Sequence, residues 1–309
     1  MSGIGSPRAQ SFKQALAHPL ALLVAQAAGL WPIWQWYVGR LREGTEERWG
    51  MLALGAALVL LWGERGNLRR QPQPALLLGA GMLTLGCALA APWLPMFLRA
   101  VLAVSALGLT LAAVLGRPGP LLPLWALLFL SLPVVTAMQL QFYLGYPLRA
   151  FTAWASRDVL AFLGLDVTQA GTVLIWMGRT VLVDAPCSGI RMLWVGMFLT
   201  ALLSYLTHAS VARFTLNAIG AFLIILGGNV LRTSLLFIKE AQIVILPAWT
   251  HEATGLVTFL LTSLLIVGIT RWRAYAYSDT LRGTGCCRRD HPRTASGNTS
   301  TIGPEAGGR

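Results

Sequence analysis

The chain has 309 residues, of which 55% are hydrophobic and only 12% are charged, and its formal net charge is +12. Charged residues usually make up about a quarter of a soluble protein. A soluble domain of this length could not remove so much apolar surface from water, whereas a lipid bilayer accepts it. The composition therefore excludes an ordinary soluble protein and indicates an integral membrane protein.

Apolar runs follow one another along the chain, and most approach the length of about 20 residues that crosses a bilayer. They predict an all-α polytopic membrane protein with about eight transmembrane helices. The second run is short for a span, and it also fits a re-entrant or tilted segment. In chain order the runs are Pro19–Val38, Trp49–Trp62, Pro74–Pro92, Phe97–Leu115, Leu121–Leu140, Ser188–Leu206, Phe214–Phe237 and Glu252–Thr270.

Basic residues are distributed unequally between the connecting segments. If both termini lie inside, the inside segments hold 14 of the 24 Lys and Arg residues, and the outside segments hold seven. Because basic residues gather on the cytoplasmic side of membrane proteins, we expect cytoplasmic termini. The positive charge is then a topology signal, and no nucleic-acid partner is expected.

The composition divides the chain into three parts. Residues 1–18 form a cytoplasmic N-terminal tail, and residues 19–270 form the transmembrane domain. Residues 271–309 are rich in Arg, Gly, Ser and Thr, which predicts a disordered cytoplasmic tail.

One long external segment, Gln141–Pro186, precedes the sixth span. Within it, Pro147–Leu163 carries its apolar side chains mostly toward one side, which predicts a small amphipathic helix on the membrane surface. Further on, Thr172–Trp176 and Arg179–Val183 are β-branched runs around a turn that contains glycine, and they predict a β-hairpin. The alternative for this second part is an irregular loop.

Three chemically capable side chains fall at one predicted depth. Cys187 immediately precedes the sixth span at its outer end, and His251 opens the eighth span at the same face. Arg232 comes 18 residues after Phe214, where the seventh span begins. A helix rises about 1.5 Å per residue, so Arg232 lies roughly 27 Å along a core of about 30 Å. The topology was assigned from charge alone, so the shared depth of these three residues is an independent observation. It predicts a candidate active site.

Each of these residues also has an ordinary structural interpretation. A free cysteine such as Cys187 is commonly a small buried hydrophobe. Arginines like Arg232 often extend from helix ends to the lipid headgroups. A histidine at a helix start, such as His251, is commonly an interface or capping residue. The common depth weakens all three interpretations together and favours a functional one.

The local sequence favours a reactive thiol at Cys187. Pro186 disfavours helix at that point, and Ser188 and Gly189 open the span, so the free N–H groups of a helix start can stabilise a thiolate or an oxyanion. In this arrangement His251 is the candidate general base and acid. A permanent positive charge suits Arg232 to an oxyanion or a substrate carboxylate.

Three further residues are candidates for supporting roles. Asn229 lies on the same helix face as Arg232 and can orient it. Arg191 lies one turn below Cys187, where it either assists the thiolate or pairs inside the bundle. Asp184 either holds one of these arginines or is a solvated loop acid. No two His or Cys residues stand at the sequence spacing that is typical of metal ligands, so no metal is expected. No cofactor is implied.

With these residues the sequence resembles the exosortase/archaeosortase family of membrane transpeptidases, over about residues 120–270. The residues that precede the cysteine also resemble the corresponding part of the family. Three blocks carry the resemblance, in order and with a span between each pair: Ala185-Pro-Cys187-Ser-Gly-Ile-Arg191, Asn229-Val-Leu-Arg232 and His251-Glu-Ala-Thr-Gly255.

The resemblance implies a cysteine peptidase or transpeptidase in the inner membrane of a bacterium, with its active site on the periplasmic face. Its partners would be membrane-anchored proteins that carry a C-terminal sorting signal, made of a short motif, a transmembrane helix and a basic cluster. Carried over to this chain, Cys187 is the nucleophile, His251 the acid and base, and Arg232 the transition-state stabiliser. The substrate motif, the acceptor and the oligomeric state stay open.

Two other classes of protein compete with the enzyme. A transporter or channel would use Arg191 and Arg232 to bind an anion in a central cavity. A structural subunit of a secretion or polysaccharide assembly would need none of the candidate residues singly. Substitution of Cys187 separates these classes, because only the enzyme requires the thiol.

Overall fold

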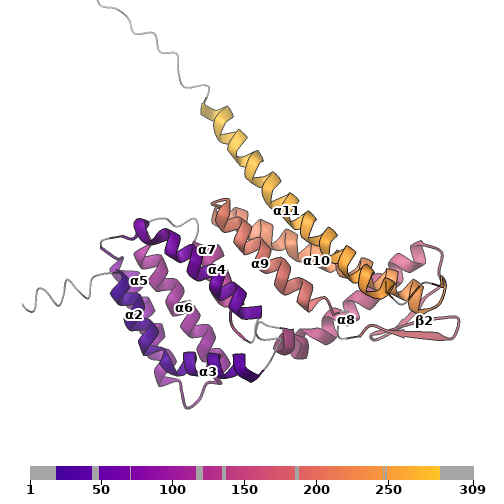
Figure 1. Ribbon diagram of the computed structural model, residues 1–309, viewed down its shortest axis with the longest axis horizontal. Coiled ribbons are helices and arrows are strands. Elements are labelled where there is room, and N and C mark those ends of the chain that lie inside the picture. The colour runs from indigo at the N-terminus through magenta and orange to yellow at the C-terminus, as the bar shows by residue number, and fades with distance from the viewer. Residues whose placement is uncertain are drawn as a thin grey trace, which may run out of the picture.

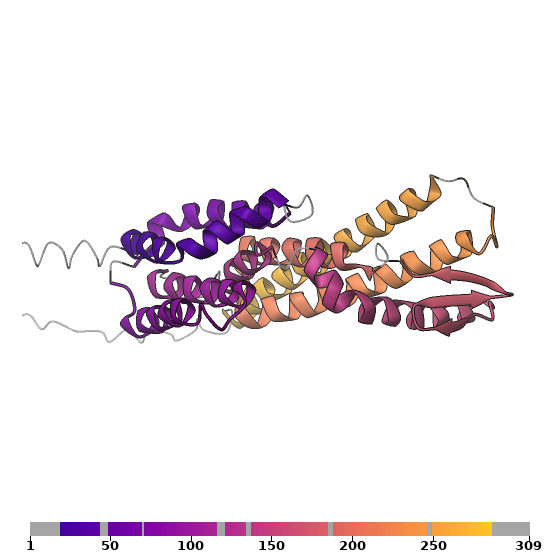
Figure 2. The same ribbon diagram turned by 90° about the horizontal axis from the view of Figure 1, so that it is seen from below.

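The chain is mostly helical, with one small antiparallel sheet (Figure 1). The helices and the sheet form an elongated body, and the sheet lies at one end of it (Figure 2). The computed structural model describes residues 19–43, 49–69, 71–115, 121–133, 137–184, 188–245, 247 and 249–285.

The N-terminal half is a layer of short apolar helices around α6 (Met96–Val114). α6 packs against α2 (Pro19–Gly29), α5 (Pro74–Leu89) and α7 (Leu121–Leu130), while α4 (Trp49–Gly63) packs against α7. Several alanines of α6 are fully buried, and their small side chains let the helices approach closely. After α4 a single 3₁₀ turn, η2 (Glu64–Asn67), leads toward α5.

The first predicted span is two helices rather than one. α2 ends at Gly29, and α3 (Trp31–Glu43) begins after Leu30. Pro32 stands in the first turn of α3, where its missing N–H interrupts no helical bond. The N–H groups of Ile33 and Trp34 instead bind the Leu30 carbonyl, at 2.9 and 3.3 Å. The predicted continuous run therefore breaks at this proline.

The fifth predicted span, Leu121–Leu140, is also interrupted. α7 ends at Leu130, and a turn that includes Pro133 follows it. The next helix, α8, begins at Ala137 and runs 26 residues to Phe162, with a proline inside it. The predicted surface helix is therefore the second part of this longer helix. Its apolar side is exposed as expected, whereas its buried side carries Thr152, Ala153, Ser156 and Leu160.

The C-terminal half is a bundle in which α10 (Val211–Glu240) is central. α10 packs against α8, against α9 (Ile190–Leu206) and against α11 (Thr250–Gly285). Close approach depends on glycines such as Gly228, which lies directly against the Thr262 side chain of α11. α11 extends past Thr270, where the last span was predicted to end, as far as Gly285.

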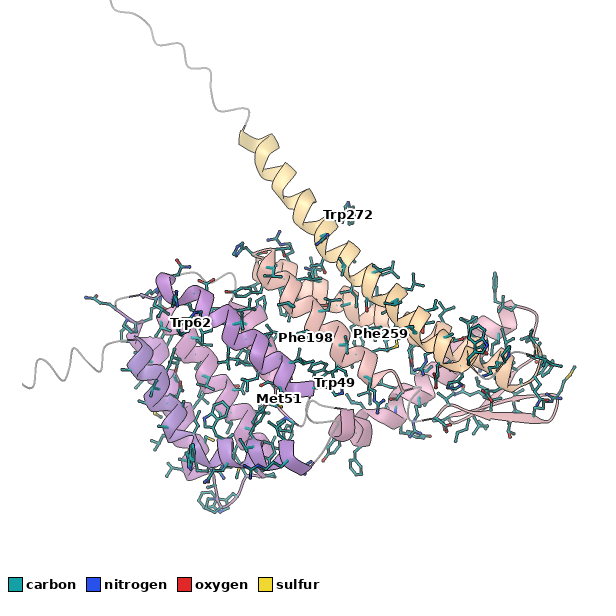
Figure 3. All side chains as sticks on the ribbon, in the orientation of Figure 1. Trp49, Met51, Trp62, Phe198, Phe259 and Trp272 are labelled. Atoms are coloured by element: carbon teal, nitrogen blue, oxygen red, sulfur yellow. The ribbon has the colours of Figure 1, made fainter. Side chains whose placement is uncertain are left out.

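Three helices within the described part of the chain are long and apolar enough to cross a bilayer: α6, α10 and residues 250–272 of α11. The helices α5, α7 and α9 are apolar but shorter. Large apolar side chains remain exposed around them: Trp62 on α4 and Trp272 on α11 are each 70% exposed (Figure 3). Lipid would cover such surfaces. The chain is thus a multi-pass membrane protein, and the count of about eight spans stays a prediction.

The predicted β-hairpin is confirmed and belongs to a three-stranded antiparallel sheet in the order β1-β2-β3. β2 (Val173–Trp176) and β3 (Arg179–Leu182) are joined by a two-residue turn. Both turn residues have positive φ, 48° at Met177 and 77° at Gly178, as a hairpin turn of this length favours. The additional strand, β1 (Thr168–Ala170), was not predicted.

The contact between Gly228 and Thr262 allows a test of the packing of α10 on α11. Gly228→Val should lower the melting temperature of the detergent-solubilised protein by roughly 2–8 °C, because overpacking costs about 1–3 kcal/mol. Gly227→Val is the matched control, since a Cβ at Gly227 would meet nothing within 4 Å. Equal melting temperatures of the two variants would contradict the packing.

Candidate active site

Cys187 lies outside the described residues, together with Ala185 and Pro186, so the candidate site is built from the segments on either side. Before it, the chain leaves β3 and reaches Asp184, which is exposed. After it, Ser188 is buried, and α9 begins at Ile190 with Gly189 as its N-cap. The N–H groups of the first turn of α9, which have no partner within the helix, therefore follow the cysteine within a few residues of sequence.

The start of α9 is held against α10 by a contact that only glycine permits. Gly189 has φ +74°, and a Cβ on it would lie 2.8 Å from Cγ of Asn229. The Asn229 side chain is 2% exposed, and its Nδ2 donates to Oγ1 of Thr152 on α8 at 3.1 Å. Sequence reasoning assigned Asn229 to the orientation of Arg232. Its contacts with Gly189 and Thr152 add a second role, because they join α8, α9 and α10 at the start of α9, two residues after the cysteine in sequence.

Arg232 lies on α10 at the interface with α11. A Cβ on Gly255 of α11 would lie 3.5 Å from both Nε and Nη2 of Arg232, so the guanidinium covers this glycine. Gly255 follows His251 by one helical turn on the same face of α11. Arg232 and the histidine block are thus adjacent across the interface of α10 with α11.

His251 is exposed in the first turn of α11 and faces a carboxylate that sequence reasoning missed. Its Nδ1 lies 3.5 Å from Oε1 of Glu240, the last residue of α10, and both side chains are about half exposed. Lys239 Nζ lies 4.0 Å from the same oxygen. A carboxylate at Nδ1 favours the tautomer with its proton there, which leaves Nε2 as the basic nitrogen. No local motif marks Glu240, since only the turn between the two helices brings it to His251.

Buried polar groups gather where α8 meets α10. Thr152 and Ser156 of α8 are buried, and Ser156 Oγ donates to the Val230 carbonyl at 3.3 Å. Such groups need partners inside the protein when lipid surrounds it.

Arg191, by contrast, is exposed in the first turn of α9. Within the described ranges, no group of three His, Cys, Asp or Glu side chains is arranged to hold a metal ion.

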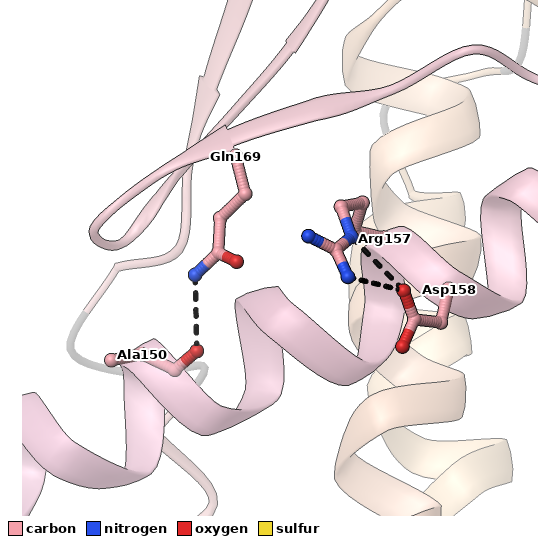
Figure 4. A network of polar contacts seen from close by, with 4 residues as sticks. All are labelled: Ala150, Arg157, Asp158 and Gln169. Atoms are coloured by element: carbon pink, nitrogen blue, oxygen red, sulfur yellow. Dashed lines mark hydrogen bonds and ion pairs between the residues drawn. The ribbon is translucent and has the colours of Figure 1, made fainter.

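The sheet that leads to the cysteine is anchored at two places. Gln169 of β1 donates from Nε2 to the Ala150 carbonyl of α8 at 3.3 Å, close to the ion pair of Arg157 and Asp158 (Figure 4). Arg179 of β3 donates from Nη1 to the carbonyl of Ala241, just after α10, at 2.6 Å. These bonds orient β3 relative to the helix bundle.

A model of the transmembrane exosortase family (Exosortase_EpsH) matches residues 36–268. The match contains every candidate residue and begins well before the interval of about 120–270 that the motifs covered. The helices from α4 onward, and the end of α3, therefore belong to the family pattern as well, whereas α2 lies outside the match. Neither the curated proteins nor the solved structures contain a match to the chain.

The contact between Gly189 and Asn229 predicts a specific sensitivity. Gly189→Ala should lower the melting temperature in detergent more than Gly178→Ala does, because the alanine Cβ at residue 189 collides with Asn229. Both glycines have positive φ, so both substitutions carry the left-handed penalty of about 1–2 kcal/mol. Only at Gly178 would the Cβ meet nothing within 4 Å. A Gly189→Ala variant no less stable than Gly178→Ala would rule out the contact.

Proposed function

Because the chain belongs to the transmembrane exosortase family, we propose that it is a membrane cysteine transpeptidase. It cleaves the C-terminal sorting signal of exported, membrane-anchored proteins. The cleaved protein is then transferred to an acceptor or released by hydrolysis. The observation that supports this proposal most is the meeting of three helix segments, which are the start of α9, the part of α10 from Asn229 to Glu240 and the first turns of α11.

The proposed reaction begins with the thiolate of Cys187. Its sulfur attacks the carbonyl carbon of the scissile peptide bond, and the tetrahedral oxyanion is stabilised by Arg232 and by the free N–H groups at the start of α9. His251 takes the thiol proton and gives it to the leaving amine, so the bond to nitrogen breaks and a thioester remains. An acceptor amine or water then attacks the thioester, loses its proton to His251 and restores the thiol.

Glu240 is proposed as the positioning residue for His251. A carboxylate beside Nδ1 favours the proton on that nitrogen and stabilises the imidazolium formed when His251 accepts the thiol proton. Both side chains are partly exposed, so the contribution is expected to be smaller than in a fully buried pair. The role concerns the orientation and charge of His251 and involves no contact with substrate.

The membrane orientation is proposed from charge. The predicted inside segments hold 14 of the 24 basic residues, which supports cytoplasmic termini and a periplasmic site in the bacterial inner membrane. The bundle end that carries the sheet would then face the periplasm. A substrate anchored by its own helix presents its motif at that same level. Anchoring thus raises the local concentration of the cleavage motif.

Loss of the thiol is expected to abolish processing of a co-expressed protein that carries a sorting signal. Cys187→Ser should leave only precursor on an immunoblot, because a hydroxyl at this position is a far poorer nucleophile. Cys87→Ser is the matched control, since Cys87 is buried in α5 and its Sγ donates to the Arg99 carbonyl at 3.3 Å. Full processing by Cys187→Ala would refute the enzyme and leave the transporter or the structural subunit.

The Glu240 role predicts a defect in turnover rather than in binding. Glu240→Gln should lower kcat about tenfold with KM nearly unchanged, because partners that orient a functional histidine typically contribute roughly 10–100-fold. Glu240→Asp should recover part of the rate, because it keeps the carboxylate. A change confined to KM, or equal rates for wild type and Glu240→Gln, would remove Glu240 from the mechanism.

A further inference from the structure

One edge of the sheet is formed by β3, the strand that leads toward Cys187. β3 pairs with β2 in a register that places Val173 opposite Leu182 and Ile175 opposite Thr180. The next pair along is Thr172 and Val183, where the Val183 N–H donates to the Thr172 carbonyl at 2.9 Å. This bond identifies which residue pairs of the ladder are hydrogen-bonded.

Hydrogen-bonded and non-hydrogen-bonded pairs alternate along an antiparallel ladder. Since Val183 is hydrogen-bonded to β2, so are Val181 and Arg179, two and four residues earlier. The intervening residues, Thr180 and Leu182, therefore direct their N–H and C=O groups away from β2. Within the described residues these groups form the open edge of β3, because the sheet ends at this strand.

The open edge of β3 is accessible, whereas the rest of the sheet is packed. Val183 is buried in an apolar cluster that includes Leu174 of β2 and Phe237 of α10. β1 and β2 lie against α8. On the opposite face, Thr180 is exposed and Leu182 is 53% exposed. A strand added beside β3 would meet free backbone groups without displacing any of these contacts.

The position of the edge along the chain indicates what it binds. β3 ends at Leu182, five residues before Cys187. Five residues reach at most about 18 Å, so Cys187 lies within the length of a short extended peptide from the end of β3. The edge exposes the backbone groups of only two residues, which suits a short extended motif better than a large protein surface.

We propose that the open edge of β3 binds the short motif of the substrate as an added strand and so delivers the scissile bond to Cys187. This inference rests on the proposed function and assigns its peptide subsite. Recognition there is through main-chain hydrogen bonds to Thr180 and Leu182, so the subsite fixes the extended conformation and register of the peptide.

The test compares Leu182→Pro with Leu182→Ala in the full-length protein, reconstituted with a membrane-anchored sorting-signal substrate. Both variants lack the leucine side chain, but only proline removes the N–H that points to the open edge. Proline is tolerated at a sheet edge, so the fold should survive. Leu182→Pro should raise KM about tenfold over Leu182→Ala. Labelling of Cys187 by a small thiol reagent should be equal in both, which reports an intact thiol.

Equal KM values for the proline and alanine variants would overturn the subsite while leaving the cysteine enzyme intact. Retained processing by Cys187→Ala would instead overturn the enzyme. A change of oligomeric state in Leu182→Pro without a change of KM would assign the edge to a second copy of the chain and also reject the subsite.

If Leu182→Pro does not fold, modified substrates test whether the peptide pairs with β3. Wild-type protein is assayed with substrate analogues in which single amides of the motif are replaced by esters. An added strand predicts that KM rises at every second position, because alternate N–H groups of the peptide face β3. A uniform or absent response along the motif would refute strand addition.

Discussion

The contact of Gly189 with Asn229, and of Asn229 with Thr152, holds the start of α9 inside the helix bundle. In a bilayer, backbone that leaves regular structure must find its partners within the protein, because lipid offers none. At the start of α9 the chain packs Gly189, which has positive φ, directly against the buried Asn229 side chain. Gly189 follows Cys187 by two residues, so the catalytic proposal depends on this contact.

α10 connects the parts of the candidate site. Asn229 faces α8 and α9, Arg232 covers Gly255 of α11, and Glu240 approaches His251 where α11 begins. These residues lie between Asn229 and the C-terminal end of one helix, so a shift of α10 would move all of them together. The sheet is tied to the same end of α10 by Arg179, and the site therefore rests on one rigid element.

Sequence reasoning recovered those features that are written in local pattern. The apolar runs located most helices, and the β-branched runs located the hairpin. The shared depth of Cys187, Arg232 and His251 stays a prediction. Sequence reasoning failed where one residue overrides a pattern: Pro32 and Pro133 each interrupt an apolar run that hydropathy alone joins. It also missed Glu240 and Thr152, because their partners are distant in sequence and only tertiary packing brings them close.

The most direct measurement is mass spectrometry of the protein mixed with a sorting-signal substrate and quenched with acid before turnover is complete. The proposal predicts a thioester between the substrate carbonyl and Cys187, sensitive to hydroxylamine, absent in Cys187→Ser and slower to form in Arg232→Ala. Conversion of the substrate with no adduct on Cys187 at any time would contradict the proposed mechanism.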